Sequence, residues 1–125
     1  NIALGAAIDF MESIGNEVFV SHEHQLLEYA QEKLSGIDGL HIYAERAPRA
    51  GAISFNLEGI GIASDVGMIL DKLGIAVRTG HHCTQPIMDF YSIAGTVRAS
   101  FAIYNTFEEI DILSEGLKKA KRMLS

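Results

Sequence analysis

The sequence has few residues of the types that define several classes of protein. It contains one cysteine, two prolines and no tryptophan. A single cysteine excludes a disulfide framework within the chain and favours a reducing compartment, so we expect a cytoplasmic protein. Two prolines exclude collagen-like or proline-rich material. No apolar run approaches the ~20 residues that a membrane-spanning helix needs, so we expect no membrane partner.

The sequence also has fewer basic than acidic residues, and it does not begin with Met. Lys and Arg number 10 against 16 Asp and Glu, which gives a net charge of −6. Nucleic-acid binding requires a positive surface, so we expect no nucleic-acid partner. The chain begins with Asn1 rather than Met and has no basic leading segment. This start does not resemble a secretory signal and suggests a processed product or an excised fragment.

The 125 residues that are present have the composition of one globular domain, spanning 1–125. Hydrophobic residues make up 48% and charged residues 21%, as in ordinary globular chains. Periodicity predicts helices and strands in alternation. The expected helices cover 2–14, 18–34, 64–73, 86–91 and a last segment after Thr106, and the expected strands cover 40–45, 52–57, 75–78 and 96–102. This order predicts an α+β two-layer sandwich, with helices packed on a small, mainly antiparallel sheet.

Several helix ends carry recognisable signals. Ser64 or Asp65 is suited to cap the third helix, and Gly74 is suited to end it in a left-handed conformation. Thr106-Phe107-Glu108-Glu109 has the pattern of a capping box, which predicts the start of the last helix.

The expected first helix, 2–14, is apolar on nearly all sides. Such a helix requires burial on most sides, and a small sheet with a few helices cannot supply it. We therefore predict an exposed apolar surface that leads either to self-association or to fraying, and we take it as a sign that an upstream segment is missing.

Cys83 is the first candidate for chemistry. It follows His81 and His82 in a loop between a strand that ends near Arg78 and a helix that begins near Pro86. A positive imidazole, the guanidinium and the N–H groups of the helix each favour thiolate over thiol, which is the reactive form. The alternative is a buried structural cysteine. We expect no metal, because adjacent side chains rarely converge on one zinc ion.

Arg98 is the second candidate. It lies within the apolar strand Thr96-Val97-Arg98-Ala99-Ser100-Phe101. A guanidinium in the middle of a strand can bind a carboxylate in a planar fork, or it can extend to water from an edge strand.

Longer motifs around both residues add a family resemblance. The run Arg78-Thr79-Gly80-His81-His82-Cys83-Thr84-Gln85-Pro86 resembles the active-cysteine loop of SufS-type (group II) cysteine desulfurases, which are pyridoxal-phosphate enzymes of the class V aminotransferase superfamily. The run from Val97 to Thr106 and the segment Gly74-Ile75-Ala76-Val77 resemble the same family. The resemblance covers essentially the whole chain. It implies the C-terminal domain of a larger enzyme, as in the small domain of fold-type I pyridoxal-phosphate enzymes.

The resemblance implies roles for individual residues. Cys83 would attack the substrate sulfur and hold it as a persulfide, and Arg98 would bind the substrate carboxylate. The active-site loop would comprise Arg78, Gly80, His81 and His82.

The resemblance also implies partners. The family converts L-cysteine to L-alanine as a homodimer and passes the sulfur to a SufE- or SufU-type acceptor for iron–sulfur cluster assembly. Ser64 precedes Asp65-Val66 where relatives that use a zinc-containing SufU acceptor tend to carry His, so we expect a SufE-type acceptor.

One departure from the family bears on activity. The cofactor lysine of the family lies in a Ser-x-His-Lys setting, and none of the five lysines here has that setting. We therefore expect pyridoxal phosphate in the full-length enzyme, none bound to this chain, and no turnover by the chain alone. Two other hypotheses stay open: a stand-alone α+β binding module whose cysteine accepts sulfur or senses redox state, and a thiol hydrolase that uses Cys83 with a nearby histidine.

Overall fold

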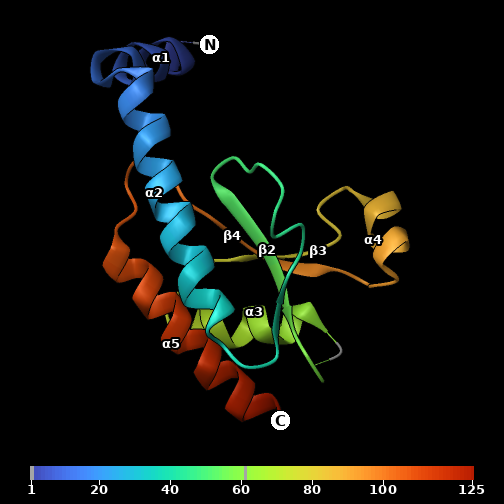
Figure 1. Cartoon of the computed structure of the whole chain (residues 1–125). Helices are drawn as coiled ribbons and strands as arrows, with labels where there is room; N and C mark the ends of the chain where they lie inside the picture. Colours follow the sequence, from blue (N-terminus) through green and yellow to red (C-terminus); the bar gives the residue numbers. More distant parts are fainter. Residues whose placement is uncertain (1, 61) are drawn as a thin grey trace.

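The computed structural model describes residues 2–60 and 62–125 (Figure 1). Two helices come first, two strands follow, and helices separate the remaining strands. The elements are α1 (Ile2–Ile14), α2 (Asn16–Ser35), β1 (Leu40–Ile42), β2 (Ala52–Leu57), α3 (Ala63–Lys72), β3 (Arg78–Gly80), α4 (Gln85–Tyr91), β4 (Thr96–Ser100) and α5 (Phe107–Leu124).

The strands form one sheet with the order β1-β2-β4-β3, and each neighbouring pair is antiparallel. The two strands with neighbours on both sides are β2 and β4, where Ile53 lies opposite Ala99 and Ser54 opposite Arg98. The predicted α+β class and the antiparallel sheet are confirmed.

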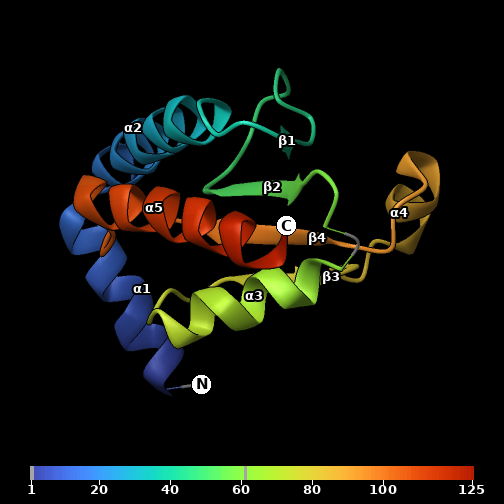
Figure 2. The same cartoon turned by 90° about the horizontal axis from the view of Figure 1, so that it is seen from below.

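One face of the sheet is apolar and carries the core. Ile53, Phe55 and Leu57 alternate along β2 and are buried, as period-two patterning requires. The helices α2, α3 and α5 lie together as a layer (Figure 2), and their apolar stripes join these strand residues. Fully buried side chains from this layer include Leu26, Leu34, Val66, Leu70, Ile110 and Leu117.

The other face of the sheet is polar. Ser54 and Asn56 point to this side from β2, and Thr96 and Arg98 point to it from β4, because their neighbours in sequence face the core. The short helix α4 lies on the far side of the molecule from α2 (Figure 1). The sheet therefore separates a hydrophobic layer from a polar surface that is available for chemistry.

Helix α1 stands apart from the core. None of its residues is buried, and it extends from the start of α2 across the direction of that helix (Figure 1). Its ring contact is a stack of Phe10 on Tyr104, with centroids 6.5 Å apart. The prediction that its apolar residues exceed the burial available is confirmed. Within residues 2–60 and 62–125, no helix is both long and apolar enough to cross a bilayer.

The strand prediction for 75–78 was wrong by three residues. Gly74 has a φ of +76°, and the amide of Ile75 donates to the Leu70 carbonyl at 2.9 Å. This bond closes the C-terminus of α3 in a Schellman-type arrangement. Residues 75–77 are therefore used to end α3, and β3 begins only at Arg78.

Other predicted bounds also shift. β1 ends at Ile42 rather than at residue 45, because Ala44 has a φ of +52° that interrupts the extended chain. The strand predicted over 96–102 ends at Ser100. The second helix begins at Asn16 rather than Val18, and the fourth at Gln85.

Of the two predicted N-terminal helix caps, the one for α3 is wrong and the one for α5 is confirmed. Neither Ser64 nor Asp65 caps α3, because the helix begins at Ala63 after Ile62, which offers no side-chain cap. The capping box of α5 is confirmed: the Glu109 amide donates to Thr106 Oγ1 at 3.3 Å, and the Thr106 amide donates to Glu109 Oε2 at 3.1 Å.

Candidate active site

A row of four side chains crosses the polar face of the sheet. The Tyr43 amide donates to the Ser54 carbonyl at 2.9 Å, Ser54 pairs with Arg98, and Arg98 pairs with Arg78. Paired residues on neighbouring antiparallel strands project to the same face. Arg78 and Arg98 therefore project from opposite positions on two neighbouring strands, and like charges placed directly opposite each other are unfavourable.

A cavity of about 600 Å³ opens over this row. Its polar lining includes Arg49, Ser54, His82 and Arg98, and no Asp or Glu is among the residues that line it. Its apolar wall comes from α4 and includes Met88, Phe90 and Tyr91. A cavity lined by cations without acids favours an anionic ligand, and guanidinium groups match a carboxylate in particular.

Arg98 is held where a ligand can use it. β4 lies between β2 and β3, so the edge-strand interpretation of Arg98 was wrong. The residue is half-buried, and its Nε is buried without a partner. Among residues 2–60 and 62–125, its guanidinium makes neither a hydrogen bond nor an ion pair. The terminal nitrogens thus remain available to grip a carboxylate.

Arg49 is a cavity residue that the sequence did not reveal. Its Nε donates to the Ala44 carbonyl at 3.3 Å and its Nη2 to the Tyr43 carbonyl at 3.2 Å. These bonds fix the guanidinium beside the row of polar side chains. An arginine after Pro48 in an irregular loop has no periodic signal, so only the folded chain identifies it.

Cys83 lies in a strained turn. The Thr84 amide donates to the His81 carbonyl at 2.9 Å, and the two central residues, His82 and Cys83, have φ values of +53° and +60°. Positive φ at both central positions is the pattern of a type I′ turn, which usually takes Asn and Gly. For residues with a Cβ, the left-handed conformation costs roughly 1–2 kcal/mol each. Cys83 is exposed, so the interpretation as a buried structural cysteine was wrong.

Side-chain hydrogen bonds hold this turn. The Cys83 amide donates to His81 Nδ1 at 3.0 Å, and Thr84 Oγ1 donates to the His81 carbonyl at 2.7 Å. His82 Nε2 lies 3.1 Å from both the carbonyl oxygen and Oγ1 of Thr96 in β4. The turn is therefore bonded within itself and also to the sheet.

Gly80 and Gly95 explain how the loop leaves the sheet. Gly80 ends β3 with a φ of +118°, which disfavours any side chain. A Cβ on Gly95 would lie 2.9 Å from the carbonyl carbon of Gly80. The close approach of these two backbones brings the turn next to the start of β4.

The protonation state of His82 corrects one expectation. Burial lowers the pKa of His82, and the charges of Arg98 and Arg78 lower it further, whereas the hydrogen bond to the Thr96 backbone raises it. His82 is therefore neutral at pH 7 and does not supply the cation that was expected to favour a Cys83 thiolate. Arg78 and Arg98, which are always charged, supply the positive potential around the turn.

The structure brings together most of the predicted site residues. His82 and Thr84 line the same cavity as Arg98, whereas Cys83 lies between them without lining it. Arg78 and His81 are exposed beside the turn. The Cys83 thiol and the Arg98 guanidinium are thus attached to adjoining parts of one surface.

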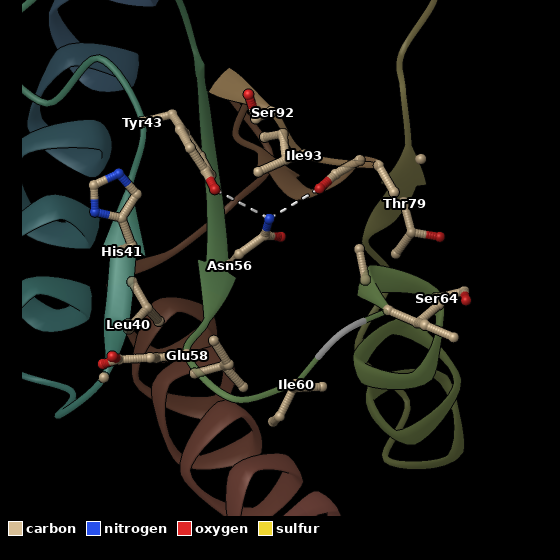
Figure 3. A pocket seen from close by; sticks show the side chains of 17 residues that line it. Leu40, His41, Tyr43, Asn56, Glu58, Ile60, Ser64, Thr79, Ser92 and Ile93 are labelled. Carbon is tan, nitrogen blue, oxygen red and sulfur yellow. Dashed lines mark hydrogen bonds between the residues drawn. The ribbon is translucent and has the colours of Figure 1, made fainter. Parts of the chain in front are cut away.

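A second cavity, of about 910 Å³, lies along the same polar face (Figure 3). Asn56 projects into the space between its walls, and its Nδ2 donates to Tyr43 Oη at 3.2 Å and to the Gly95 carbonyl at 2.9 Å. These bonds connect β1, β2 and the segment before β4. Ser64, at the start of α3, also lines this cavity. Tyr43 and Ile93 line both cavities, so the two adjoin.

The lysines of the chain lie away from both cavities. Lys33 pairs with Asp111 at 2.7 Å, Lys118 pairs with Glu115 at 2.7 Å, and Lys121 pairs with Asp38 at 2.9 Å. All five lysines belong to α2, α3 or α5, which cover the opposite face of the sheet, and none lines either cavity. A pyridoxal-phosphate site needs a lysine for the Schiff base. The residues present therefore do not form such a site.

The described residues also contain no group of three or more His, Cys, Asp or Glu placed to hold a metal ion.

The fold and site define an α+β domain that presents a strained cysteine turn beside an arginine-lined cavity. The chain belongs to the class-V aminotransferase family, whose sequence profile matches residues 1–113. It is 49% identical over 120 residues to a probable cysteine desulfurase from Halalkalibacterium halodurans, and 47% identical over 123 residues to a cysteine desulfurase from Serratia proteamaculans. These alignments cover 96% and 98% of the chain but only 29% and 30% of the two relatives.

Solved structures of cysteine desulfurases are also similar to this chain. The apo cysteine desulfurase from Thermococcus onnurineus NA1 superposes with a TM-score of 0.88 at 38% identity, covering 98% of this chain and 31% of that one. The cysteine desulfurase CsdA from Escherichia coli, in an S-sulfonic acid form, has a TM-score of 0.77 at 31% identity, covering 85% and 26%. The chain thus spans less than a third of the length of the relatives that it matches.

Proposed function

We propose that this chain is the C-terminal domain of a SufS-type cysteine desulfurase, in which Cys83 accepts sulfur from L-cysteine. One arrangement carries the proposal. Cys83 is exposed in a strained, hydrogen-bonded turn that follows β3, and Arg98 lies on the neighbouring strand β4 with no partner among the described residues. The similarity to cysteine desulfurases over nearly the whole chain supports it.

The residues of this chain would bind the substrate and accept its sulfur. Arg98 would grip the α-carboxylate of L-cysteine in a planar fork, and the thiolate of Cys83 would form a new S–S bond with the substrate sulfur. In sum, L-cysteine and the Cys83 thiol become L-alanine and a Cys83 persulfide, so atoms balance. The carbon–sulfur bond breaks and its electron pair stays with the substrate carbon. One of the two thiol protons goes to that carbon, and the other remains with the persulfide.

Pyridoxal phosphate belongs to the remainder of the enzyme. It stabilises carbanions next to an amino group, and the lysine that would hold it is not among the five in this chain. We therefore assign no step of the cofactor chemistry to the residues described here.

Substitutions at the two site residues of the full-length enzyme test the proposal. Cys83→Ser should abolish persulfide formation, and Arg98→Gln should raise the KM for L-cysteine by about 100-fold, since it removes a charge-assisted fork. Alanine release and mass spectrometry of the Cys83 peptide give the readouts. Arg122→Gln, an exposed arginine on α5, is the matched control. Full alanine release by Cys83→Ser would contradict the proposal.

The acceptor and the assembly are further parts of the proposal. We propose transfer of the persulfide sulfur to a SufE-type acceptor and, from there, to iron–sulfur cluster assembly in the cytoplasm, by an enzyme that works as a homodimer. Transfer from ³⁵S-labelled Cys83 to purified SufE-type and SufU-type proteins would compare the two acceptors. Faster transfer to the SufU-type protein would overturn the choice based on Ser64.

A further inference from the structure

His82 carries a hydrogen-bonding arrangement that the proposed chemistry does not use. Its ring reaches out of the turn and bonds to Thr96, which is 2% exposed and belongs to the interior strand β4. The other side-chain hydrogen bonds that the described residues show for the turn join residues within 81–84, and the Thr84 carbonyl accepts from the amides of Ile87 and Met88 in α4. His82 thus provides the side-chain connection between the Cys83 turn and the sheet.

The tautomer of His82 follows from this connection. The Thr96 carbonyl oxygen only accepts, so it is bonded in the tautomer whose Nε2 carries the ring proton and donates it. Nδ1 is then an unprotonated acceptor, and it is buried without a partner. A buried acceptor without a partner is unfavourable, so the ring is placed here at the expense of one hydrogen bond. Both features indicate a neutral ring that holds position rather than one that exchanges protons.

The connection also determines where the thiol stands relative to Arg98. Thr96 and Arg98 are two residues apart on β4, so their side chains share one face of the sheet. A bond from His82 to Thr96 therefore ties the residue before Cys83 to the strand that presents Arg98. A substrate that is held at its carboxylate and attacked at its sulfur requires a constant distance between the Cys83 thiol and Arg98.

We infer that His82 is a positioning residue, which sets the distance between the Cys83 thiol and the carboxylate held by Arg98. The inference rests on the proposed function. It differs from a role in acid–base catalysis, because the ring acts through a hydrogen bond to Thr96 and through the backbone of the turn.

The test uses His82→Ala and His82→Gln in the full-length enzyme. Gln keeps an N–H donor near the place of Nε2 but cannot titrate. His82→Ala should lower kcat by about tenfold or more, as misplacement of a reacting group does, while KM for L-cysteine stays within about twofold. His82→Gln should recover kcat to within about threefold of the wild-type enzyme and keep the shape of its pH profile.

A second readout does not depend on turnover. The amide of Thr84 closes the turn, so its hydrogen exchange should be faster in His82→Ala and return to the wild-type rate in His82→Gln. His24→Ala, which removes an exposed histidine of α2, is the matched control for both readouts. Unchanged exchange at Thr84 in His82→Ala would overturn the inference.

Thr96→Val completes a double-mutant cycle. It removes Oγ1 but keeps the carbonyl that also bonds to Nε2, so it should lower kcat by less than His82→Ala does and cause no further loss in the His82→Ala background. Additive losses would overturn the inference, and so would a His82→Gln enzyme as slow as His82→Ala. Activity of Cys83→Ser would instead remove the proposed function itself, whatever the His82 variants do.

Discussion

At the scale of single residues, the site is defined by backbone strain and by an excess of positive charge. Two adjacent residues with side chains, His82 and Cys83, take the left-handed conformation that glycine normally supplies. Two arginines, Arg78 and Arg98, pair across neighbouring strands. Neither feature stabilises the fold, and both place a thiol and a positive potential beside one cavity. Strain and like charges of this kind gather at functional sites.

The lowered pKa of His82 predicts how stability changes with pH. The unfolded chain has the ordinary value of about 6.5, and the folded chain has a lower one. As the pH falls below about 6.5, the unfolded chain binds the proton first, so the free energy of unfolding decreases. The decrease stops below the folded-state value, where both states are protonated.

Urea unfolding between pH 8 and pH 5 measures this effect. His82→Gln should show a shallower loss over the same range, with the difference taken relative to pH 8, where the wild-type ring is neutral in both states. Parallel profiles for the two proteins would show that the His82 ring takes up its proton equally well when folded.

The arginine pair predicts the reactivity of Cys83. Cys83 is exposed beside Arg78 and Arg98, so it should react with iodoacetamide faster than an ordinary exposed cysteine at pH 7. Arg78→Gln should slow that reaction by roughly two- to fivefold, which is what an exposed charge contributes, and high salt should remove the difference. Arg122→Gln on α5 is the control that keeps the wild-type rate. If Cys83 reacts at the same rate in Arg78→Gln and in Arg122→Gln, its reactivity comes from the turn alone.

At the scale of elements, helix ends and helix α1 show what local sequence can achieve. The capping box of α5 joins two residues that lie three positions apart, and it forms as the sequence predicts. Helix α1 also forms where predicted, but with no buried residue. Local signals therefore place helices, whereas they do not supply a surface for those helices to pack against.

Removal of the α5 cap should be measurable. Thr106→Ala removes the acceptor of the Glu109 amide, and the free energy of unfolding should fall by about 1 kcal/mol. Glu109→Gln keeps an oxygen that can accept from the Thr106 amide, so its loss should be smaller. Urea unfolding gives both values, and an equal loss for the two variants would contradict the reciprocal bonding of the box.

The exposed face of α1 predicts association. Ile2, Leu4 and Ile8 are exposed by 94%, 64% and 47%, and each large side chain left in water forgoes roughly 1.5–3 kcal/mol of burial. We expect the chain to self-associate through α1 or to fray there. Light scattering with hydrogen exchange over residues 2–14 decides this, and Ile8→Glu should reduce any association. A monomer with strong amide protection along α1 would contradict the prediction.

At the scale of the whole molecule, the sheet divides the chain into a stabilising side and a chemical side. The core and all five lysines lie with the helix layer, whereas Arg98, the Cys83 turn and both cavities belong to the polar side. Among the described residues, no lysine lines either cavity of the polar side, and pyridoxal phosphate needs a lysine for its Schiff base.

The 125-residue chain should therefore be inactive by itself. With pyridoxal phosphate and L-cysteine added, it should show neither Schiff-base absorbance nor alanine formation, and the full-length enzyme is the positive control. Turnover that disappears on substitution of one of the five lysines would show that this chain is not a fragment that depends on a separate cofactor domain.

Local patterns in the sequence were enough to predict the α+β class, the periodicity of β2 and of the helices, and the α5 cap, and they named Cys83 and Arg98 as candidates for the site. These features depend on neighbours within a few positions, or on the motif around Cys83. Periodicity is local, so it survives in a single sequence without coordinates.

Contacts between distant segments set the remaining features. The Ile75 bond to Leu70 moved β3 to Arg78, the place of β4 inside the sheet made Arg98 an interior residue, and Arg49 joined the cavity from an irregular loop. Burial among cations made His82 neutral, and Thr96 became its partner although 14 positions separate them. Each of these outcomes depends on contacts between distant segments, and the free energy of such contacts exists only once the chain has folded.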